Sequence, residues 1–365
     1  MKRCHLAYLA CTAALVGVGL GAVPAAAAHK ILVVHQGESI QKAVDAARAG
    51  DTVFVLGGTY HESVKISTPR VTLRGVGPGT VIKPVGTKPA PKPPKTTAAK
   101  AAISCAEGGN GICVVGTKTK NVEGVTVSDL TVTGFSRAGV FGMATDGMTV
   151  HRVYAVKNGV WGIAQERSVR GLFRDNYARD NGDAGLFLAN TIKEEAGAYD
   201  AGRTLVEHNR FEGNRIGVTV RRLRNLTLAE NYVTGNCAGV FVVGDENKPK
   251  AGNVQVTSNR VDKNNKSCPK TERLPALQGS GIVLTGTEKN RVAGNLVTGH
   301  AGKSPLSGGI VLFKSFVGVT SDQNVVDQNT LQNNSPADLV NTETKGRGNS
   351  FRGNSCRVSR PAGLC

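Results

Sequence analysis

Apolar and polar positions recur in one order along most of the chain, from about residue 121 to residue 355. Each copy holds an apolar stretch, an Asn, a short alternating run, a second Asn, a small residue, a Gly and a β-branched run. The step is 22 residues from Asn209 to Asn231 and again from Asn214 to Asn236, and longer steps are this unit plus insertions. This period predicts one turn of a β-solenoid, because a helical repeat would need about 33 residues and an apolar period of about 3.6.

Stacked turns can bury what a single turn cannot, because each turn is too small to cover its own apolar face. In the β-branched run, Val218 and Val220 are expected to point inward and Thr219 outward. Asn suits the corners because its amide can bond to the backbone and to the Asn of the next turn, and because it tolerates left-handed dihedral angles. The second Asn position is held by Asn158, Asn181, Asn214, Asn236 and Asn264, and in weaker copies by His300 and Asn333. We interpret the corner histidines as replacements for Asn: His151, His208 and His300.

The predicted fold class is therefore all-β, a single-stranded right-handed parallel β-helix with three strands per coil and an N-terminal capping helix. The cap is predicted over residues 39–50, where four residues share one helical face before Gly50 ends the helix. These four are Ile40, Ala43, Val44 and Ala47. We expect the cap and first coils at 29–82, a Pro- and Lys-rich exposed insertion at 83–100, coil repeats at 101–355 and a pinned tail at 356–365.

The first 28 residues have the order of a secretory leader. A short basic start at Lys2 and Arg3 precedes a mostly apolar run, and small residues end at Ala28. We therefore expect a signal peptide at 1–28 and a secreted mature chain. No later run is long and apolar enough to span a bilayer, so no membrane span is expected.

Six cysteines remain after this leader, and an even number in an exported chain favours disulfides over metal thiolates. Among the alternatives, local spacing favours the pairs Cys105–Cys113, Cys237–Cys268 and Cys356–Cys365.

The net charge of +18 suits an acidic partner, either an anionic polysaccharide or nucleic acid. Aromatic residues are only 5% of the chain, and the basic residues are spread out with no helical nucleic-acid motif. An acidic polysaccharide is therefore the expected partner, nucleic acid is not expected, and the chain is expected to be a monomer. Diffuse basicity for solubility or wall affinity is the alternative interpretation.

The segment from Ser39 to Ile66, with the order SIQ-x-AVDAA-x-x-GDTV-x-V-x-x-GTY-x-E-x-V-x-I, resembles the start of proteins of the pectin lyase-like superfamily. The later coils resemble the parallel β-helix repeats of that group, including periplasmic proteins of copper-site maturation and mannuronan epimerases. The resemblance covers nearly the whole mature chain and implies the fold. It does not select an activity, because the superfamily holds lyases, hydrolases, epimerases and non-enzymes. The Asp-Asp and Gly-His-Gly motifs of the related polygalacturonases and the Arg-x-Pro-x-x-Arg motif of pectate lyases are missing.

Insertions cluster on both flanks of the strand that follows the second Asn, at residues 189–202, 243–252, 266–279 and 301–308. Loops on both sides of one strand stack predict a groove with two walls and a floor, and long loops often carry function. Tolerated surface drift is the alternative. The floor residues expected to face outward are Phe141, Phe187, Thr219, Phe241, Val283 and Val311.

Acidic and basic side chains follow these strands as a band of alternating sign. In uronate chemistry, an arginine neutralises the substrate carboxylate while a base removes the neighbouring proton, and paired carboxylates can instead hydrolyse glycosides. The candidate catalytic residues are Glu166, Arg222, Asp245 and Glu246. The candidate substrate-binding residues are Arg167, Phe187, Asn190, Arg221, Arg224, Phe241 and Lys314. An ordinary ladder of solvated salt bridges is the alternative.

We thus expect a secreted protein that binds an acidic polysaccharide in this groove and, if it is an enzyme, processes it as a lyase, hydrolase or epimerase. A non-catalytic cell-wall or surface module for adhesion is the alternative, and a maturation-type binding protein is disfavoured because the coils lack Met, Cys or His clusters. No cofactor is expected. Ca²⁺ would have one conceivable site, at Glu166, Asp183 and Asp245.

Overall fold

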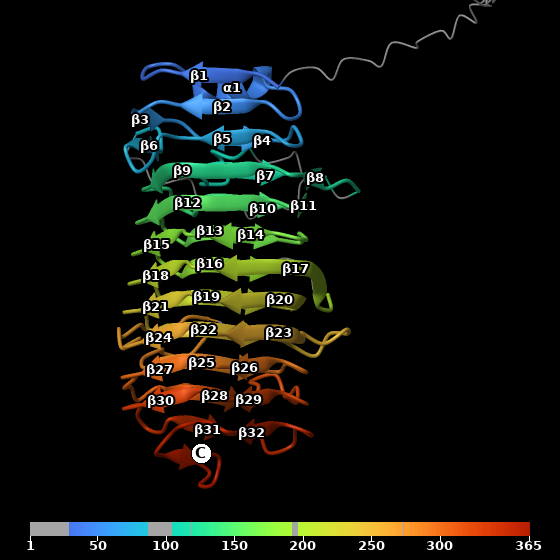
Figure 1. The fold of residues 1–365 in the computed structure, drawn as a ribbon, viewed down its shortest axis with the longest axis vertical. Helices are drawn as coiled ribbons and strands as arrows, with labels where there is room; N and C mark the ends of the chain where they lie inside the picture. The colour runs from blue at the N-terminus through green and yellow to red at the C-terminus, as the bar shows by residue number, and fades with distance from the viewer. Residues whose placement is uncertain (1–28, 87–103, 118, 192–195, 273) are drawn as a thin grey trace, which may run out of the picture.

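The computed structural model describes residues 29–86, 104–117, 119–191, 196–272 and 274–365. These residues form a tall column of stacked coils, with the C-terminus at the bottom in Figure 1. All paired strands are parallel to their neighbours, and each full coil contributes three strands. The predicted all-β, right-handed parallel β-helix is confirmed.

The strand that follows the second Asn builds an 11-stranded sheet, here called sheet B. Its strands are β4 (Val64–Ile66), β7 (Ile112–Val115), β10 (Ala138–Met143), β13 (Trp161–Glu166), β16 (Ala184–Ala189), β19 (Ile216–Arg221), β22 (Ala238–Val243), β25 (Ser280–Thr285), β28 (Gly308–Phe313), β31 (Leu339–Asn341) and β33 (Ser359–Arg360).

The other two strands of each coil form a 20-stranded sheet made of two stacks. Stack A1 follows sheet B along the chain and holds β1 (Ile31–Val34), β2 (Thr52–Val55), β5 (Thr72–Arg74), β14 (Leu172–Arg174), β17 (Tyr199–Glu207), β20 (Leu223–Ala229), β23 (Gly252–Thr257), β26 (Arg291–Ala293), β29 (Val325–Asp327) and β32 (Ser350–Arg352). Stack A2 holds β3 (Gly58–His61), β6 (Thr80–Lys83), β15 (Tyr177–Arg179), β18 (Arg210–Glu212), β21 (Tyr232–Thr234), β24 (Arg260–Asp262), β27 (Leu296–Thr298) and β30 (Thr330–Gln332). The long strands β9 (Thr126–Thr133) and β12 (Thr149–Val156) belong to both stacks, and β8 (Val122–Glu123) pairs only with β11 (Thr145–Asp146).

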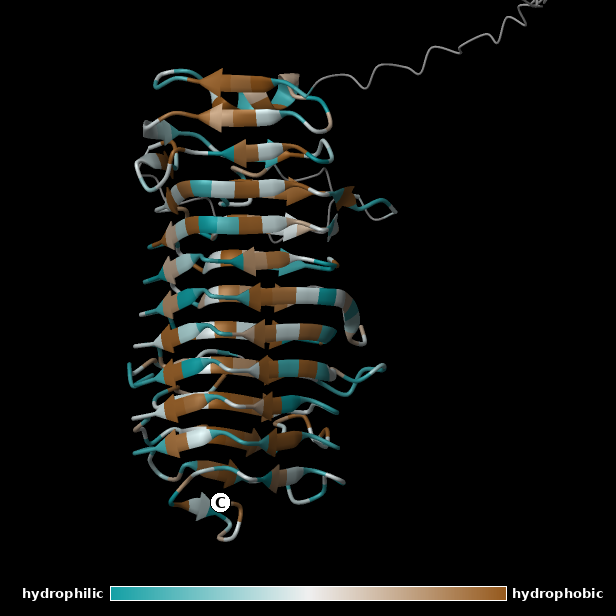
Figure 2. Cartoon of the chain, in the orientation of Figure 1, coloured by the Kyte–Doolittle hydropathy of each residue, from teal (hydrophilic) through white to brown (hydrophobic). Residues whose placement is uncertain are grey.

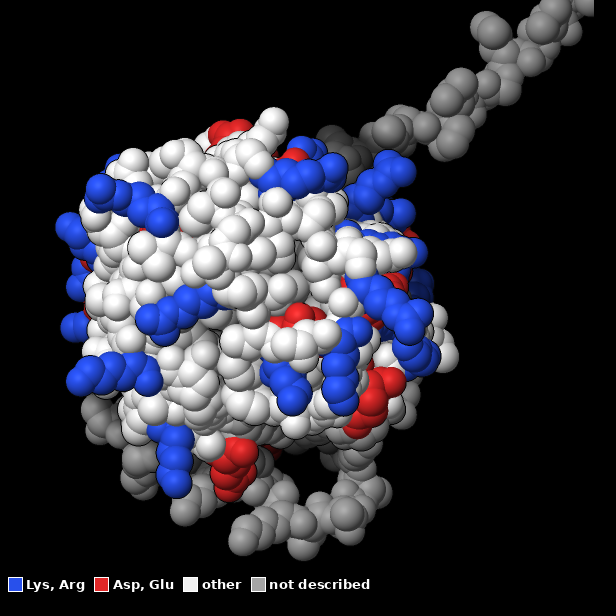
Figure 3. Space-filling model, turned by 90° about the horizontal axis from the view of Figure 1, so that it is seen from below, with Lys and Arg blue, Asp and Glu red and all other residues white. Residues whose placement is uncertain are grey.

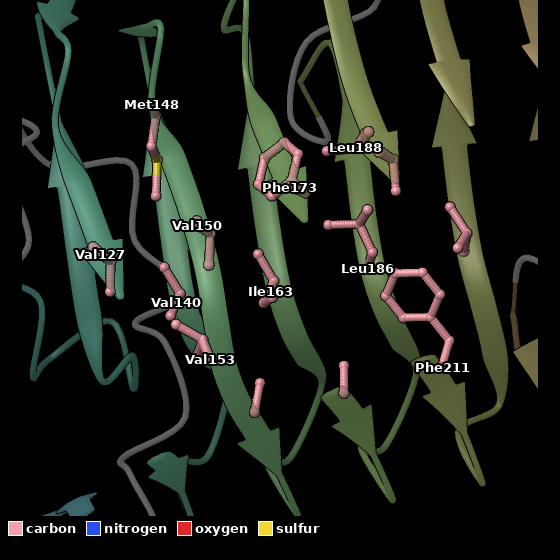
Figure 4. Packing of buried hydrophobic residues seen from close by; sticks show 14 of the residues in the cluster. Val127, Val140, Met148, Val150, Val153, Ile163, Phe173, Leu186, Leu188 and Phe211 are labelled. Carbon is pink, nitrogen blue, oxygen red and sulfur yellow. The ribbon is translucent and has the colours of Figure 1, made fainter. Parts of the chain in front are cut away.

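The shared core fills the interior of the coils, as predicted from the alternation of side chains. Val218 and Val220 are each 1% exposed and belong to one continuous apolar cluster. Figure 4 shows Val140, Ile163 and Leu186 of this cluster on successive strands, and Figure 2 shows apolar positions repeating down the strands. Stacking each coil on its neighbour removes these side chains from water, which is the main stabilising term of a solenoid.

The predicted N-terminal cap is present as α1 (Ile40–Ala46). Ser39 caps it by accepting a 3.3 Å hydrogen bond from the Lys42 amide, and Ile40 and Val44 are buried against the first coil. The helix ends at Ala46, before the predicted terminator Gly50, because Ala47 already has an extended backbone.

Two long ladders of asparagine side chains run along two corners of the column, and a shorter one at the third corner joins Asn290, Asn324 and Asn349. The first joins Asn176, Asn209, Asn231, Asn259, Asn295, Asn329 and Asn354. The second joins Asn158, Asn181, Asn214, Asn236, Asn264, His300 and Asn334.

Three details of the second ladder differ from or refine the prediction. His300 replaces Asn, as expected, but His151 and His208 lie outside the ladders because their side chains face outward and pair with carboxylates. The last member is Asn334, whose neighbour Asn333 adopts a left-handed backbone and is exposed.

The three predicted disulfides are all present, and the one between Cys356 and Cys365 closes the C-terminal tail. No helix within the described ranges is long and apolar enough to cross a membrane. The predicted signal peptide and residues 87–100 of the predicted insertion lie outside the described residues.

Candidate functional site

The outward face of sheet B is covered. Phe187 and Phe241 point away from the shared core but are only 6% and 3% exposed, and Val283 and Val311 are fully buried. A second apolar cluster lies on this face, in which Leu277 and Leu306 from the flanking insertions pack over the strands. The prediction of an open floor is therefore wrong. From β22 to β28 the outward apolar side chains are buried by the same insertions that were predicted to stand beside them as walls, whereas Phe187 stacks on Trp161 in a separate cluster.

The predicted band begins where β13, β16 and β19 end. Glu166 pairs in register with Ala189, which pairs with Arg221, so Glu166 and Arg221 hold equivalent positions two coils apart. Glu166 is 4% exposed, whereas Arg221 is half-buried and donates a 3.3 Å hydrogen bond to the Thr191 carbonyl.

The next residues of the same coils also stack. The amide of Arg167 donates to the Asn190 carbonyl at 2.8 Å, and the Asn190 amide side chain donates to the Gly197 carbonyl at 2.6 Å. The structure thus brings Glu166, Arg167, Asn190 and Arg221 to one edge, where the basic and amide side chains contact backbone carbonyls of the loops.

Arg222 and Asp245 form an ion pair with each other, and their side chains are 4% and 17% exposed. The other Asp245 oxygen accepts 3.2 Å hydrogen bonds from the backbone and side-chain amides of Asn247. This carboxylate therefore holds the loop that follows β22. Glu246, its neighbour, is exposed.

Two further ion pairs secure the same region. Arg224 donates to Glu288 at 2.8 Å and also to the Lys250 carbonyl. The ammonium group of Lys250, which is 7% exposed, lies 2.6 Å from Asp322. Lys314, at the far end of the predicted band, is exposed.

The conceivable Ca²⁺ site is not assembled. Asp183 precedes β16, whereas Glu166 ends β13 and Asp245 follows β22. Asp183 therefore lies at one end of the sheet B strands, and Glu166 and Asp245 lie at the other. Within the residues that the structure describes, no group of three or more His, Cys, Asp or Glu side chains could hold a metal ion.

A different constellation lies at the beginning of the sheet B strands, here called the Trp161 cluster and defined as Arg137, Trp161, Asp183, Phe187 and Arg215. The rings of Trp161 and Phe187 stack with centroids 4.6 Å apart and an interplanar angle of 13°. The Arg137 guanidinium carbon lies 5.0 Å from the Trp161 ring centroid on successive coils. The indole N–H donates to Asp183 Oδ2 at 3.3 Å.

Burial raises the pKa of the Asp183 carboxyl, and the Trp161 hydrogen bond and the charge of Arg215 only partly oppose this. Arg215 is 7% exposed and anchors the insertion 266–279 by donating to the carbonyls of Pro269 and Pro275 at 2.7 and 3.3 Å. A half-buried carboxyl whose pKa is raised by burial keeps its proton to a higher pH than an exposed carboxyl does.

The sequence reasoning named Asp183 only for Ca²⁺ and missed Trp161, Arg137 and Arg215. One signal was available, since the single Trp of the chain lies one coil before Asp183 and Phe187. Asp183 was not recognised as a member of this cluster because it follows a ladder residue, Asn181, by only two positions and therefore falls among the corner residues.

The sequence model of the family described as "Right handed beta helix region" matches residues 100–255 and 190–316. No curated protein matches the chain in sequence.

Solved structures share the fold at low identity. The A-module of mannuronan C-5 epimerase AlgE4 from Azotobacter vinelandii is 16% identical, with a TM-score of 0.53 over 87% of this chain and 92% of that one. The family 28 exopolygalacturonase from Yersinia enterocolitica is 13% identical, with a TM-score of 0.58 over 90% and 77%. The Dettilon tailspike protein (gp208) is 16% identical, with a TM-score of 0.56 over 90% of this chain, which spans only 58% of that protein.

Proposed function

The chain belongs to the right-handed β-helix family, and from this premise we propose that it is an exported protein that binds an acidic polysaccharide and processes it at the Trp161 cluster. The observation that carries the proposal is the half-buried Asp183 carboxyl, which hydrogen-bonds the Trp161 indole and lies near the charge of Arg215. Two of the solved structures that share the fold are named for mannuronan and for polygalacturonate. The net charge of +18 favours an anionic polymer in the same way.

The chemistry follows from the protonation of Asp183. In its neutral form, which the raised pKa favours, the carboxyl can donate a proton to the oxygen of a glycosidic bond. In its ionised form it can accept the proton next to a uronate carboxylate. In either case the guanidinium group of Arg137 can pair with the substrate carboxylate, because arginine pairs well with planar anions, while the buried Arg215, which loop carbonyls hold, adds positive charge nearby.

A non-catalytic binding module is the second candidate, and specific contacts favour it. Asp245 is committed to Arg222, Glu166 is buried, and insertions cover the outward face of sheet B from β22 to β28. If the protein is such a module, its basic side chains retain the polysaccharide without changing it chemically.

The test exposes the whole protein to pectate, alginate, hyaluronan and chondroitin, with and without Ca²⁺. Retention in affinity gels reports binding. Ultraviolet absorbance of unsaturated sugars, new reducing ends and proton NMR of the polymer report lyase, hydrolase and epimerase action. The matched variants are Asp183→Asn and Asp180→Asn, since Asp180 lies three residues earlier and its side chain is 39% exposed.

An enzyme at this site should process one polymer, lose that activity in Asp183→Asn and keep it in Asp180→Asn. Binding with no chemical change in any polymer would leave the adhesion candidate. Failure to bind every acidic polymer would contradict the proposed function altogether.

A further inference from the structure

The chain turns from sheet B into stack A1 at residues that share a left-handed backbone. Register places them at equivalent positions in successive coils, because Leu172 pairs with Leu205, Leu205 with Thr227, Leu226 with Val254, Gln255 with Arg291 and Arg291 with Val325. We call this set the corner column: Arg170, Arg203, Asn225, Asn253, Lys289 and Gln323. At about 4.8 Å per coil, its five steps span about 24 Å along the axis.

An open hollow of about 800 Å³ lies on the first four positions of the corner column. Leu226, Thr227 and Gln255 of β20 and β23 also line it. Its wall is a bulge in β17, where the register shifts between Asp200 and Thr204. In Figure 1 the first residues of β17 accordingly curl at the edge of the column.

Hydrogen bonds hold this wall in place. One Asp200 oxygen accepts from the Gly202 amide and the other from the Asn225 side chain, both at 2.7 Å. The Asn225 side-chain oxygen in turn accepts from Asn253 at 3.2 Å. Both Asp200 oxygens are therefore engaged within the wall.

The arginines of the hollow differ in their contacts. Arg170 donates to Asp146 at 2.6 Å and its side chain is 66% exposed. Arg203 is exposed, and within the described part of the chain its guanidinium makes no hydrogen bond or ion pair. The hollow therefore presents one unengaged cation beside the side-chain amides of Asn225 and Asn253.

A second hollow of about 660 Å³ continues the corner column toward the C-terminus. It is lined by Gln323 together with Lys345 and Arg347, and the exposed Lys289 lies between the two hollows. Its one acid is Asp322. Although burial raises the pKa of this carboxyl, the hydrogen bonds from Lys250, the Arg347 amide and Thr320 outweigh this effect, and the pKa is lowered. Asp322 is therefore ionised, and its charge is engaged by these donors. Seen from the C-terminal end, Lys and Arg side chains project around the rim of the molecule (Figure 3).

We infer that the corner column is a binding track for a short acidic oligosaccharide that lies parallel to the axis of the coils. Guanidinium and ammonium groups along the track match the carboxylates of such a chain, and side-chain amides match its hydroxyl groups. The first hollow has the size of a small-ligand site. Its lining holds no aromatic ring on which a nucleobase would stack.

This inference takes its ligand class from the proposed function but places the contact elsewhere. The Trp161 cluster lies where the sheet B strands begin, whereas the corner column follows the end of those strands. The track would hold one part of the polysaccharide while another part of the same polysaccharide reaches the Trp161 cluster.

The experiment compares two double variants that lose the same charge from the same kind of backbone position. Arg203→Asn with Lys289→Asn removes two cations of the track. Lys157→Asn with Lys263→Asn removes two exposed cations from the corner between stack A2 and sheet B. All four residues have positive φ, between 46° and 67°, which Asn tolerates well.

Calorimetry with hexamers of galacturonate and mannuronate, and with a neutral glucose hexamer, measures the affinity of the full chain. We expect the track double variant to bind its uronate hexamer about tenfold more weakly or worse, since two charge-assisted contacts are lost. The control double variant should stay within about twofold of the parent. Unfolding temperatures of the two variants verify that both are folded.

Equal weakening in both double variants, or unchanged binding in the track variant, would overturn the track while leaving polysaccharide binding intact. Equally tight binding of the neutral hexamer would overturn the acidic class of the ligand. If the parent binds no acidic oligomer or polymer, the track and the proposed function fail together.

Discussion

The side-chain oxygen of Asn231 accepts two hydrogen bonds from Asn209 of the preceding coil, from its backbone amide at 3.0 Å and its side-chain amide at 2.9 Å. The Nδ2 atom of Asn231 donates in turn to the carbonyls of Val206 and Ala229, both at 2.9 Å. One buried side chain thus satisfies backbone groups that the corner leaves without a strand partner. The ladder fixes the position of each coil on the next as well as the turn itself.

We predict that Asn231→Ala lowers the free energy of unfolding by about 3 kcal/mol, because it leaves several buried donors and acceptors without partners. Urea unfolding followed by circular dichroism measures the loss. Asn354→Ala is the matched control, since Asn354 is half-buried and is the last residue of this ladder within the described part of the chain. A control loss as large as that of Asn231→Ala would contradict the importance of the interior ladder.

Asp245 is paired with a buried arginine, whereas its neighbour Glu246 is exposed. Replacing Asp245 should therefore lower the stability of the protein much more than replacing Glu246. Asp245→Ala deprives the buried Arg222 guanidinium of its carboxylate and should cost roughly 3 kcal/mol of unfolding free energy. Glu246→Ala changes an exposed side chain and should be nearly neutral. Thermal unfolding of both proteins, with polysaccharide binding measured alongside, decides the matter. A stable Asp245→Ala protein that no longer binds would restore Asp245 as a ligand residue.

The repeat was predictable because the β-helix is built from local rules that the sequence repeats. Asn209 and Asn231 recur in phase, Val218 and Val220 alternate, and a one-residue error would turn every apolar side chain outward. The cap was predictable for a similar reason, since Ile40 and Val44 share one helical face and Ser39 precedes them.

The surface was less predictable because it depends on where the insertions fold. Alternation correctly turned Phe187 and Phe241 away from the core, but no periodic rule shows that insertions will cover Phe241 or that Trp161 will stack on Phe187. The hollow on the corner column depends on a bulge in β17, which two extra residues produce. The partner of Asp245 was equally hidden, because the loop that carries it folds back over Arg222.

The raised pKa of Asp183 predicts a pH dependence of stability. An acid whose pKa is higher in the folded protein contributes stability below its unfolded value, about 3.9, and loses it as pH rises through the folded value. Asp183→Asn should therefore gain stability relative to the parent as pH rises through this window. Unfolding temperatures of the two proteins between acidic and neutral pH measure the gain, with Asp180→Asn as the control. Parallel profiles for Asp183→Asn and the parent would show that Asp183 titrates normally.

His300, in the second ladder, predicts a pH dependence of stability with the opposite sign. Its Nε2 accepts from the Asn264 side-chain amide at 3.0 Å, and its Nδ1 faces the Asn334 oxygen at 2.9 Å, so the hydrogen-bond network assigns the proton to Nδ1. Burial lowers the pKa of His300 to about 4, and the Asn334 hydrogen bond and the charge of Asp262 oppose this only in part. A second proton, on Nε2, would confront the amide donor of Asn264.

Stability that depends on neutral His300 is present above pH 6.5 and is lost as pH falls toward 4. The full loss is about 3 kcal/mol, and His300→Asn should escape it because Asn fits the ladder and does not titrate. Urea unfolding at neutral pH and near pH 4 should show a smaller acid loss in His300→Asn than in the parent. His208→Asn is the control, since the His208 side chain is 53% exposed. If His208→Asn reduces the acid loss as much as His300→Asn does, general charge rather than the buried ladder position controls acid stability.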